Sequence, residues 1–306
     1  MKNWIVVLLI GLLCGFAGAE NNAAEAADAQ ATAPRRGTLY RVSHQGNTSY
    51  LFGTIHVGKS AFYPLEAEVT HALSRAAKLV LEIDVRDSAP FQAALYKHGM
   101  YAHGDTVDRH LSADSLNHLR QALQNFNLRF DQVERMKPWL LANMLIGLAL
   151  ERHGYRRSQG IETFLLAQAD KQAKAVGELE SAEYQMALFD SMPDAMQEQY
   201  LRENLAELGD GQAIRKAQAL IDAWAGANGE ALEALLQESL QEKTVSSEFT
   251  RSVLLDRRNP EMASKIEALL KAGETTFVGV GLLHLVGETG VPGLLRQKGY
   301  EVEKLY

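Results

Sequence analysis

The chain has 306 residues, of which 46% are hydrophobic and 23% are charged, and its formal net charge is -7. This balance is that of an ordinary globular protein, and it excludes disordered and fibrous classes. Nothing in the charge balance would neutralise a run of phosphates, so we expect no nucleic-acid partner. A single cysteine excludes an intramolecular disulfide and a cysteine-based zinc site, which leaves histidine and carboxylate as the expected metal ligands.

The N-terminus has the features of an export signal. Lys2 precedes an apolar run at residues 4–13 that is too short to span a bilayer, and Ala17-Gly18-Ala19 resembles a signal-peptidase site. We therefore expect residues 1–19 to be a signal peptide and the protein to be periplasmic or secreted. Once the signal peptide is removed, we expect no transmembrane segment.

Cys14 lies inside the expected signal peptide and raises the question of a lipid anchor. Leu12 and Leu13 precede it where lipidation requires small residues, so we expect no anchor there. The alanine-rich residues 20–36 have no clear amphipathic face, and we expect them to form a flexible linker. Residues 37–306 are then expected to form a single domain.

Short β-type runs predict strands near both ends of this domain and one in its middle. Strands are expected at residues 38–43, 49–55, 79–84, 175–179, 276–281 and 301–305. Gly46 and Asn47 separate the first two strands and predict a hairpin. Apolar residues at helical spacing predict a helix over residues 65–76, and this strand-helix-strand order favours parallel pairing of the second and third strands.

Most of the remaining chain has the alanine, leucine and charge rhythm of helices. Helices are expected at residues 116–126, 139–150, 161–174, 196–208, 212–225 and 230–240. Pro138, Pro193 and Pro260 lie near expected helix starts, where a missing N–H costs little. The sequence therefore predicts an α/β fold with a long helical insertion between two sheet-forming halves.

Two short patterns of the form Gly-x-x-His follow or end apolar strands. They are Gly53-Thr54-Ile55-His56 and Gly281-Leu282-Leu283-His284. Ligand sites in open α/β sheets gather at the carboxyl ends of strands, so His56 and His284 can converge on one point. The alternative is that each histidine only caps its strand and hydrogen bonds to a carbonyl group.

Carboxylates stand in comparable places. Glu82 interrupts the apolar run of the third strand, and Glu162 lies at a helix start. Glu178 and Glu180 fall at the end of the middle strand. Two histidines and one or two glutamates can hold a divalent ion that keeps a position open for water. The alternatives are that Glu82 lies on an edge strand facing solvent and that Glu162 interacts only with the helix dipole.

Arginines occur in two groups that are able to meet an anion. Arg257 and Arg258 precede an expected helix and can face an anionic or carbonyl substrate, although solvation is an equal alternative. For Arg152, Arg156 and Arg157, a solvated helix end is the favoured interpretation.

Several segments, taken together and in chain order, resemble members of the TraB/GumN family. They are Tyr50-Leu51-Phe52-Gly53-Thr54-Ile55-His56-Val57-Gly58, Leu81-Glu82-Ile83-Asp84, Lys137-Pro138-Trp139, Gly160-Ile161-Glu162, Gly177-Glu178-Leu179-Glu180, Arg257-Arg258-Asn259-Pro260 and Phe277-Val278-Gly279-Val280-Gly281-Leu282-Leu283-His284-Leu285. The resemblance covers residues 38–306, nearly the whole chain that would remain after export.

The resemblance implies both a fold and a chemistry. The family is similar to the Tiki metalloproteases and to an erythromycin-esterase-like fold, which implies a mixed β-sheet flanked by helices and a hydrolytic site. It implies His56 and His284 as metal ligands, with Glu82 as a third ligand or general base. Glu162 would be a supporting acid, and an arginine of the pair 257–258 would orient the substrate. The implied cofactor is a divalent metal such as Mn²⁺ or Co²⁺.

We therefore expect an exported metal-dependent hydrolase that acts on a peptide or a small molecule, with peptide bonds as the first-choice target. One alternative is a metal-independent, esterase-like hydrolase in which His56 acts as a general base together with Glu82. Another is a regulator that binds a peptide or small ligand without turnover. The sequence leaves the substrate, the metal and the oligomeric state open.

Overall fold

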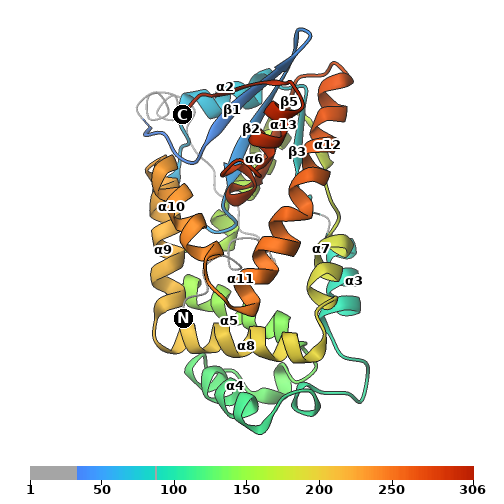
Figure 1. The fold of residues 1–306 in the computed structure, drawn as a ribbon, viewed down its shortest axis with the longest axis vertical. Coiled ribbons are helices and arrows are strands. Elements are labelled where there is room, and N and C mark those ends of the chain that lie inside the picture. Colours follow the sequence, from blue (N-terminus) through green and yellow to red (C-terminus); the bar gives the residue numbers. More distant parts are fainter. Residues whose placement is uncertain (1–32, 87) are drawn as a thin grey trace.

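The computed structural model describes residues 33–86 and 88–306 (Figure 1). The signal peptide predicted over residues 1–19, with Cys14, and most of the predicted linker lie outside the described residues. Within the described part, no helix is both long enough and apolar enough to cross a bilayer.

The described residues form one six-stranded sheet with the order β4-β3-β5-β2-β1-β6. Its strands are β1 (Leu39–His44), β2 (Asn47–Thr54), β3 (Lys78–Leu81), β4 (Ala175–Glu178), β5 (Thr276–Gly281) and β6 (Glu301–Lys304). The strands β2, β3, β4 and β5 run parallel, whereas β1 is antiparallel to both of its neighbours. The predicted α/β class with a mixed sheet is therefore confirmed.

β1 and β2 form the predicted hairpin. Their pairing extends to His44 and Asn47, so that Gln45 and Gly46 alone make the turn. Both turn residues have positive φ angles, 48° and 86°. Two successive positive φ angles let a two-residue turn follow the right-handed twist of the strands it joins.

The centre of the sheet differs from the prediction. β2 and β3 run parallel but do not pair with each other, because β5 lies between them. Every residue of β5 is buried. A run of valine, phenylalanine and glycine suits a strand that is covered on both faces. The last part of the chain thus supplies the middle of the sheet.

Helices separate the strands and make up most of the described chain. They are α2 (Ala67–Arg75), α3 (Ser88–Gly99), α4 (Ala113–Asn125), α5 (Pro138–Arg152), α6 (Ile161–Lys171), α7 (Ala182–Asp190), α8 (Asp194–Gly209), α9 (Gln212–Ala225), α10 (Gly229–Leu240), α11 (Val245–Phe249), α12 (Arg258–Lys271) and α13 (Val291–Gln297). The six helices expected in the insertion are confirmed, as is the helix expected to start near Pro260, which is α12, whereas α3, α7, α11 and α13 were not anticipated. A π-helical segment, Thr250–Asp256, joins α11 to α12.

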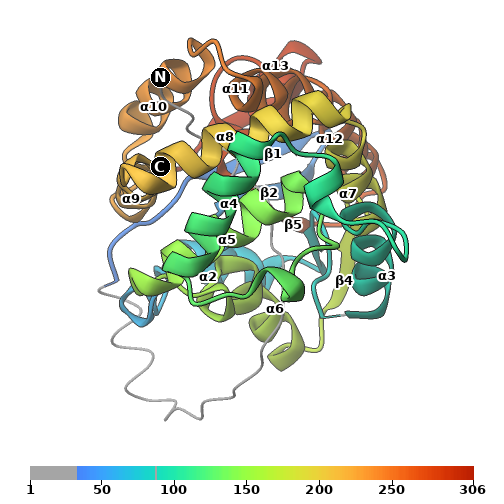
Figure 2. The same ribbon diagram turned by 90° about the horizontal axis from the view of Figure 1, so that it is seen from below.

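The sheet lies at one end of the molecule, and α4, α5 and α8 lie at the other end (Figure 1). Figure 1 shows the carboxyl ends of the parallel strands directed towards α5, α8 and α9. Seen from below, α4, α5 and α8 lie in front of the strands (Figure 2). One core cluster joins Met262, Ile266 and Leu295, from α12 and α13, to Val80 and Val278 of the sheet.

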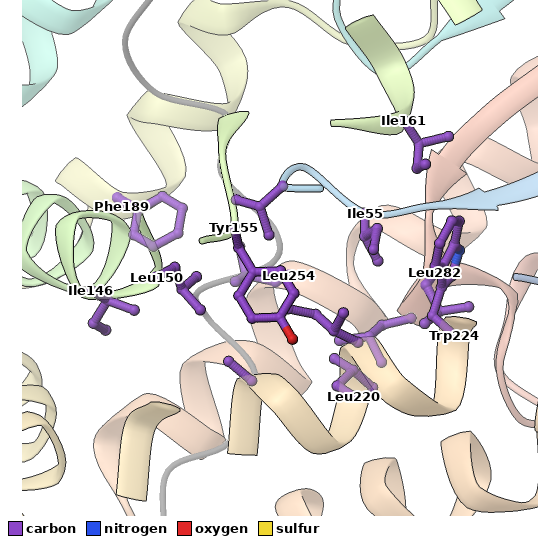
Figure 3. Packing of buried hydrophobic residues seen from close by; sticks show 14 of the residues in the cluster. Ile55, Ile146, Leu150, Tyr155, Ile161, Phe189, Leu220, Trp224, Leu254 and Leu282 are labelled. Carbon is purple, nitrogen blue, oxygen red and sulfur yellow. The ribbon is translucent and has the colours of Figure 1, made fainter. Parts of the chain in front are cut away.

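A larger core cluster joins the sheet to the helical end (Figure 3). Ile55, Leu282 and Trp224 all belong to it. The indole Nε1 of Trp224, in α9, donates a hydrogen bond of 2.8 Å to the carbonyl oxygen of Gly53. This contact ties the end of β2, where the first Gly-x-x-His pattern begins, to the helical layer.

Candidate functional site

The carboxyl ends of the parallel strands carry the side chains that form the candidate site. His56 follows β2, Glu82 follows β3, and Glu180 follows β4. His284 lies in the short turn Leu282–Leu285 that follows β5. Because parallel strands end at the same edge of a sheet, these side chains are brought to one edge.

The two Gly-x-x-His segments touch each other. A Cβ atom at Gly53 would lie 3.0 Å from Cδ1 of Leu282 and 3.4 Å from its Cα atom. Glycine at this position therefore lets the two segments approach closely. The close approach brings the ends of β2 and β5, and with them His56 and His284, to one place.

His56 faces Glu162, the second residue of α6. Its Nδ1 atom lies 2.8 Å from Oε1 of Glu162. At this distance the two side chains form an ion pair when the imidazole is protonated. The side chains are 12% and 13% exposed, but Nε2 of His56 and Oε1 of Glu162 are themselves buried.

Backbone contacts hold the start of α6 against the loop that carries His56. Gly58 and Arg156 exchange two backbone hydrogen bonds of 2.9 and 2.7 Å. A Cβ atom at Gly58 would lie only 1.9 Å from the carbonyl oxygen of Gln159, and one at Gly160 would lie 2.7 Å from that of His56. Both glycines are thus needed for the approach that sets Glu162 opposite the imidazole.

The charges of His56 and Glu162 support each other. Burial lowers the pKa of an imidazole, but the Glu162 carboxylate outweighs this effect and raises the pKa of His56. Burial raises the pKa of a carboxyl group, but His56 outweighs it and lowers the pKa of Glu162. The pair is therefore able to hold a proton on its imidazole.

Glu82 and Glu180 share a buried arginine, Arg258, at the start of α12. Nη2 of Arg258 lies 2.6 Å from Oε2 of Glu82 and 2.7 Å from Oε2 of Glu180, and its Nε lies 3.0 Å from Oε1 of Glu180. The Nε2 amide of Gln185 donates to both carboxylates, at 3.0 and 2.7 Å. One guanidinium thus offsets part of the two negative charges, and one amide orders both carboxylates.

Both oxygens of Glu82 are engaged. Oε2 accepts from Arg258 and Gln185, and Oε1 accepts a 2.5 Å hydrogen bond from the backbone N–H of Gly281, at the end of β5. Burial would raise the pKa of this carboxyl group, but Arg258, the two histidines and the hydrogen bond from Gly281 together outweigh burial and hold the pKa at about 2. Glu82 is therefore an ionised carboxylate that is difficult to protonate.

His284 is buried and oriented by Asn259. Its Nδ1 lies 2.6 Å from Oδ1 of Asn259, whose Nδ2 donates to the carbonyl oxygen of Thr289 at 2.8 Å. Because Asn259 uses its amide group as a donor elsewhere, its oxygen accepts the proton of Nδ1. Burial and the charge of Arg258 lower the pKa of His284 to about 3, so the imidazole is neutral with its lone pair on Nε2.

The Nε2 atoms of His56 and His284 are both buried without a hydrogen-bond partner. An imidazole whose Nδ1 is held by a carboxylate or amide, and whose Nε2 is free, has the arrangement of a metal ligand. Nε2 of His284 lies 3.8 Å from Oε1 of Glu82. Two ligands of one ion, each bound at about 2.1 Å, lie about 3–3.5 Å apart.

The donor atoms are of the kinds that bind a divalent ion. The 3.8 Å between Nε2 of His284 and Oε1 of Glu82 is longer than the separation of two ligands bound to the same ion. Within residues 33–86 and 88–306, no group of three or more His, Cys, Asp or Glu side chains is arranged as a metal site. The donors that the sheet edge offers are two free imidazole nitrogens and one carboxylate already paired with Arg258.

Two pairs of residues that the sequence could not distinguish differ in their burial. Arg258 is 1% exposed, whereas Arg257 is exposed and its Cζ atom lies 5.9 Å from the ring centroid of Tyr184. Glu180 is buried beside Arg258, whereas Glu178 is exposed and accepts a hydrogen bond from the backbone of Asp84. Only one member of each pair belongs to the cluster.

Two members of the cluster were not singled out in the sequence. Asn259 directly follows Arg258 in the Arg257-Arg258-Asn259-Pro260 motif, so a closer look at that motif could have found it. Gln185 lies in α7 without any recognisable pattern. Its position depends on how α7 packs, which no local signal encodes.

The chain is similar in sequence to several known proteins. The uncharacterized protein YbaP of Shigella flexneri is 28% identical over 254 residues, covering 81% of this chain and 88% of YbaP. YbaP of Escherichia coli (strain K12) is 27% identical over 253 residues, with 81% and 87% covered. The metalloprotease TIKI2 of Danio rerio is 23% identical over 304 residues, covering 83% of this chain and 58% of TIKI2.

No solved structure matches the chain at a significant level. The model of the TraB/PrgY/gumN family matches residues 38–304, which is most of the chain. This match confirms the resemblance seen in the motifs, and the chain belongs to the TraB/PrgY/gumN family.

Proposed function

We propose that this protein is an exported, metal-dependent hydrolase whose first-choice substrate is a peptide bond. One observation carries the proposal: two histidines at the same sheet edge have oriented Nδ1 atoms and buried, unpartnered Nε2 atoms. The similarity to a protein named a metalloprotease supports the same reading.

His56, His284 and Glu82 are the residues that would hold the ion. A bound Mn²⁺ or Co²⁺ would polarise the scissile carbonyl group and lower the pKa of water. Glu162 would keep His56 oriented, and Asn259 would do the same for His284. Such second partners of metal-binding histidines commonly change metal affinity or activity by about 10- to 100-fold when they are removed.

We assign proton transfer to Glu162 in place of Glu82. Glu82 is a weak base, because its pKa is held at about 2 and both of its oxygens accept hydrogen bonds. The Glu162 carboxylate instead lies 2.8 Å from the imidazole of His56, so a proton can pass between the two groups. Arg258 would then act by keeping Glu82 charged, and Arg257 would have no part in catalysis.

A second candidate function is metal-free ester or amide hydrolysis. The pairing of His56 with Glu162 favours it, since an imidazole held by a carboxylate is a common general base. In this mechanism Nε2 of His56 would take the proton of an attacking water.

Hydrolysis of a peptide library with and without EDTA separates these functions. The metal-dependent reading predicts cleavage that EDTA abolishes and Mn²⁺ restores, and that Glu162→Gln reduces by at least about 100-fold. Cleavage that EDTA leaves unchanged would favour the metal-free mechanism. Depletion of a peptide in a fixed ratio, with no new products, would indicate a binding regulator.

Export is a separate part of the proposal. If residues 1–19 are a signal peptide, the protein recovered from the periplasm or the medium begins at Glu20. Mass spectrometry of the intact exported chain tests this. A mass that includes Met1 would contradict cleavage at this position.

A further inference from the structure

Arg157 is half-buried and has no counter-ion. Its Nη1 atom is buried and has no hydrogen-bond partner, and no carboxylate of the described residues lies within ion-pair distance of the side chain. Burial lowers its pKa, and Glu151 acts on it only through its charge. A charge removed from water is costly unless a partner compensates it. The sequence favoured a solvated position for Arg157, and in the structure the side chain is half-buried with its Nη1 atom out of contact with water.

Helix α5 is shaped to accept this guanidinium. A Cβ atom at Gly147 would lie 2.6 Å from Nη2 of Arg157 and 3.4 Å from its Cζ. Apart from proline, glycine is the least favourable residue inside a helix, so its use in the middle of α5 calls for a local reason. The missing side chain is what lets the guanidinium lie against the helix.

Arg157 also lies beside the candidate site. It begins the turn Arg157–Gln159, directly before Gly160, which packs against the carbonyl oxygen of His56. The turn that Arg157 begins is therefore held against the loop that carries His56.

A second cation lies on the loop that follows His56. The ammonium group of Lys59 lies 5.2 Å from the ring centroids of both Phe62 and Tyr155. None of the described carboxylates forms an ion pair with it. The two cations give this border of the site a positive charge, in a chain whose net charge is -7.

We propose that Arg157 binds a carboxylate group of the substrate. The planar guanidinium matches a carboxylate with two parallel hydrogen bonds, and such bonds are strongest where water is excluded. This inference rests on the proposed function, which places the hydrolysed bond beside His56. It restricts the substrates to molecules that carry a carboxylate near that bond. The carboxylate is either the C-terminus of a peptide or an acidic side chain.

Binding to the full-length protein tests the inference without any turnover. Three probes differ only in their charge: N-acetylglycine has a terminal carboxylate, N-acetylglutamic acid α-amide has a side-chain carboxylate, and N-acetylglycinamide is neutral. We expect the protein to bind at least one of the two acids about tenfold or more tightly than the neutral amide, by calorimetry or thermal shift. The acid that binds more tightly identifies the source of the group.

Arg157→Met should abolish this preference. Arg156→Met is the matched control, because Arg156 is the exposed neighbour, and it should keep the preference. Since Arg157 has no partner to lose, Arg157→Met should unfold at the same temperature as the parent or higher. If that variant does not fold, Arg157→Gln takes its place.

The inference is overturned if the parent binds all three probes equally, or if the folded Arg157 variant still prefers the acids. Neither result depends on hydrolysis. A protein that prefers the acids through Arg157 but cleaves nothing would contradict the proposed function and leave the binding role of Arg157 intact.

Discussion

The buried triad of Arg258, Glu82 and Glu180 leads to the most specific stability prediction. Replacement of Arg258 by Met leaves two carboxylates in a site where Arg258 is 1% exposed and the glutamates are 8% and 1% exposed. Breaking a buried ion pair by removing one partner typically costs about 3–5 kcal/mol. We expect Arg258→Met to lie at the upper end of that range, because one guanidinium serves both acids.

The control is the preceding residue. Arg257 is exposed and has only the ring of Tyr184 nearby, at 5.9 Å, so Arg257→Met should cost less than about 1 kcal/mol. The double variant Arg258→Met/Glu180→Met removes one of the stranded charges. Residues in one network are not additive, and the double variant should be more stable than the sum of single costs implies by about 1–3 kcal/mol.

Urea unfolding at pH 7, followed by the helical circular dichroism signal, measures these costs. Equal costs for Arg257→Met and Arg258→Met would refute the assignment of Arg258 to the buried cluster. Strictly additive costs for Arg258 and Glu180 would show that the pair does not interact.

Three further predictions follow from particular contacts. Gly58→Ala should destabilise the protein by about 2–4 kcal/mol in urea unfolding, because its Cβ would lie 1.9 Å from the carbonyl oxygen of Gln159. Gly209→Ala, at the end of α8 with no atom within 4 Å of the new Cβ, should be neutral or stabilising, and equal losses would contradict the packing argument. Glu66 is 4% exposed, and burial raises the pKa of its carboxyl group to about 7, so folding stability falls as the pH rises through 7. Glu66→Gln should match the parent at pH 4–5 and exceed it at pH 8 by about 1–3 kcal/mol, whereas a pH-independent difference would exclude this cause. Asn259→Leu should lower Mn²⁺ affinity by about 10- to 100-fold because His284 loses its orientation, and unchanged affinity in a folded variant would contradict that role.

The strands could be predicted because their signals are local. Short apolar and β-branched runs marked each of them, and the ends of the strands then pointed to His56, Glu82 and His284. The place of β5 between β2 and β3 was not predictable, because it depends on which segments pair across most of the chain. Short helices such as α7, with nine residues, hold too few turns to show a periodic pattern.

Packing determines which of several similar side chains are buried, and the local sequence does not show this. Arg257 and Arg258 are neighbours where the π-helical segment meets α12, and only Arg258 turns inward there. The burial of Arg157 depends on Gly147, which lies ten positions earlier in a different helix. A reading of the local sequence contains neither fact, so a solvated arginine was the natural expectation.

The central claim is that the two Gly-x-x-His segments form one metal site. Mn²⁺ affinity of the purified protein, measured beside His56→Ala and His284→Ala, tests it most directly. His118→Ala is the control, since that side chain is 57% exposed and lies in α4. We expect the parent and the control to bind Mn²⁺ alike, and each of the two site variants to lose binding while still unfolding cooperatively. Absence of binding in the parent, or binding that survives both substitutions, would contradict the claim.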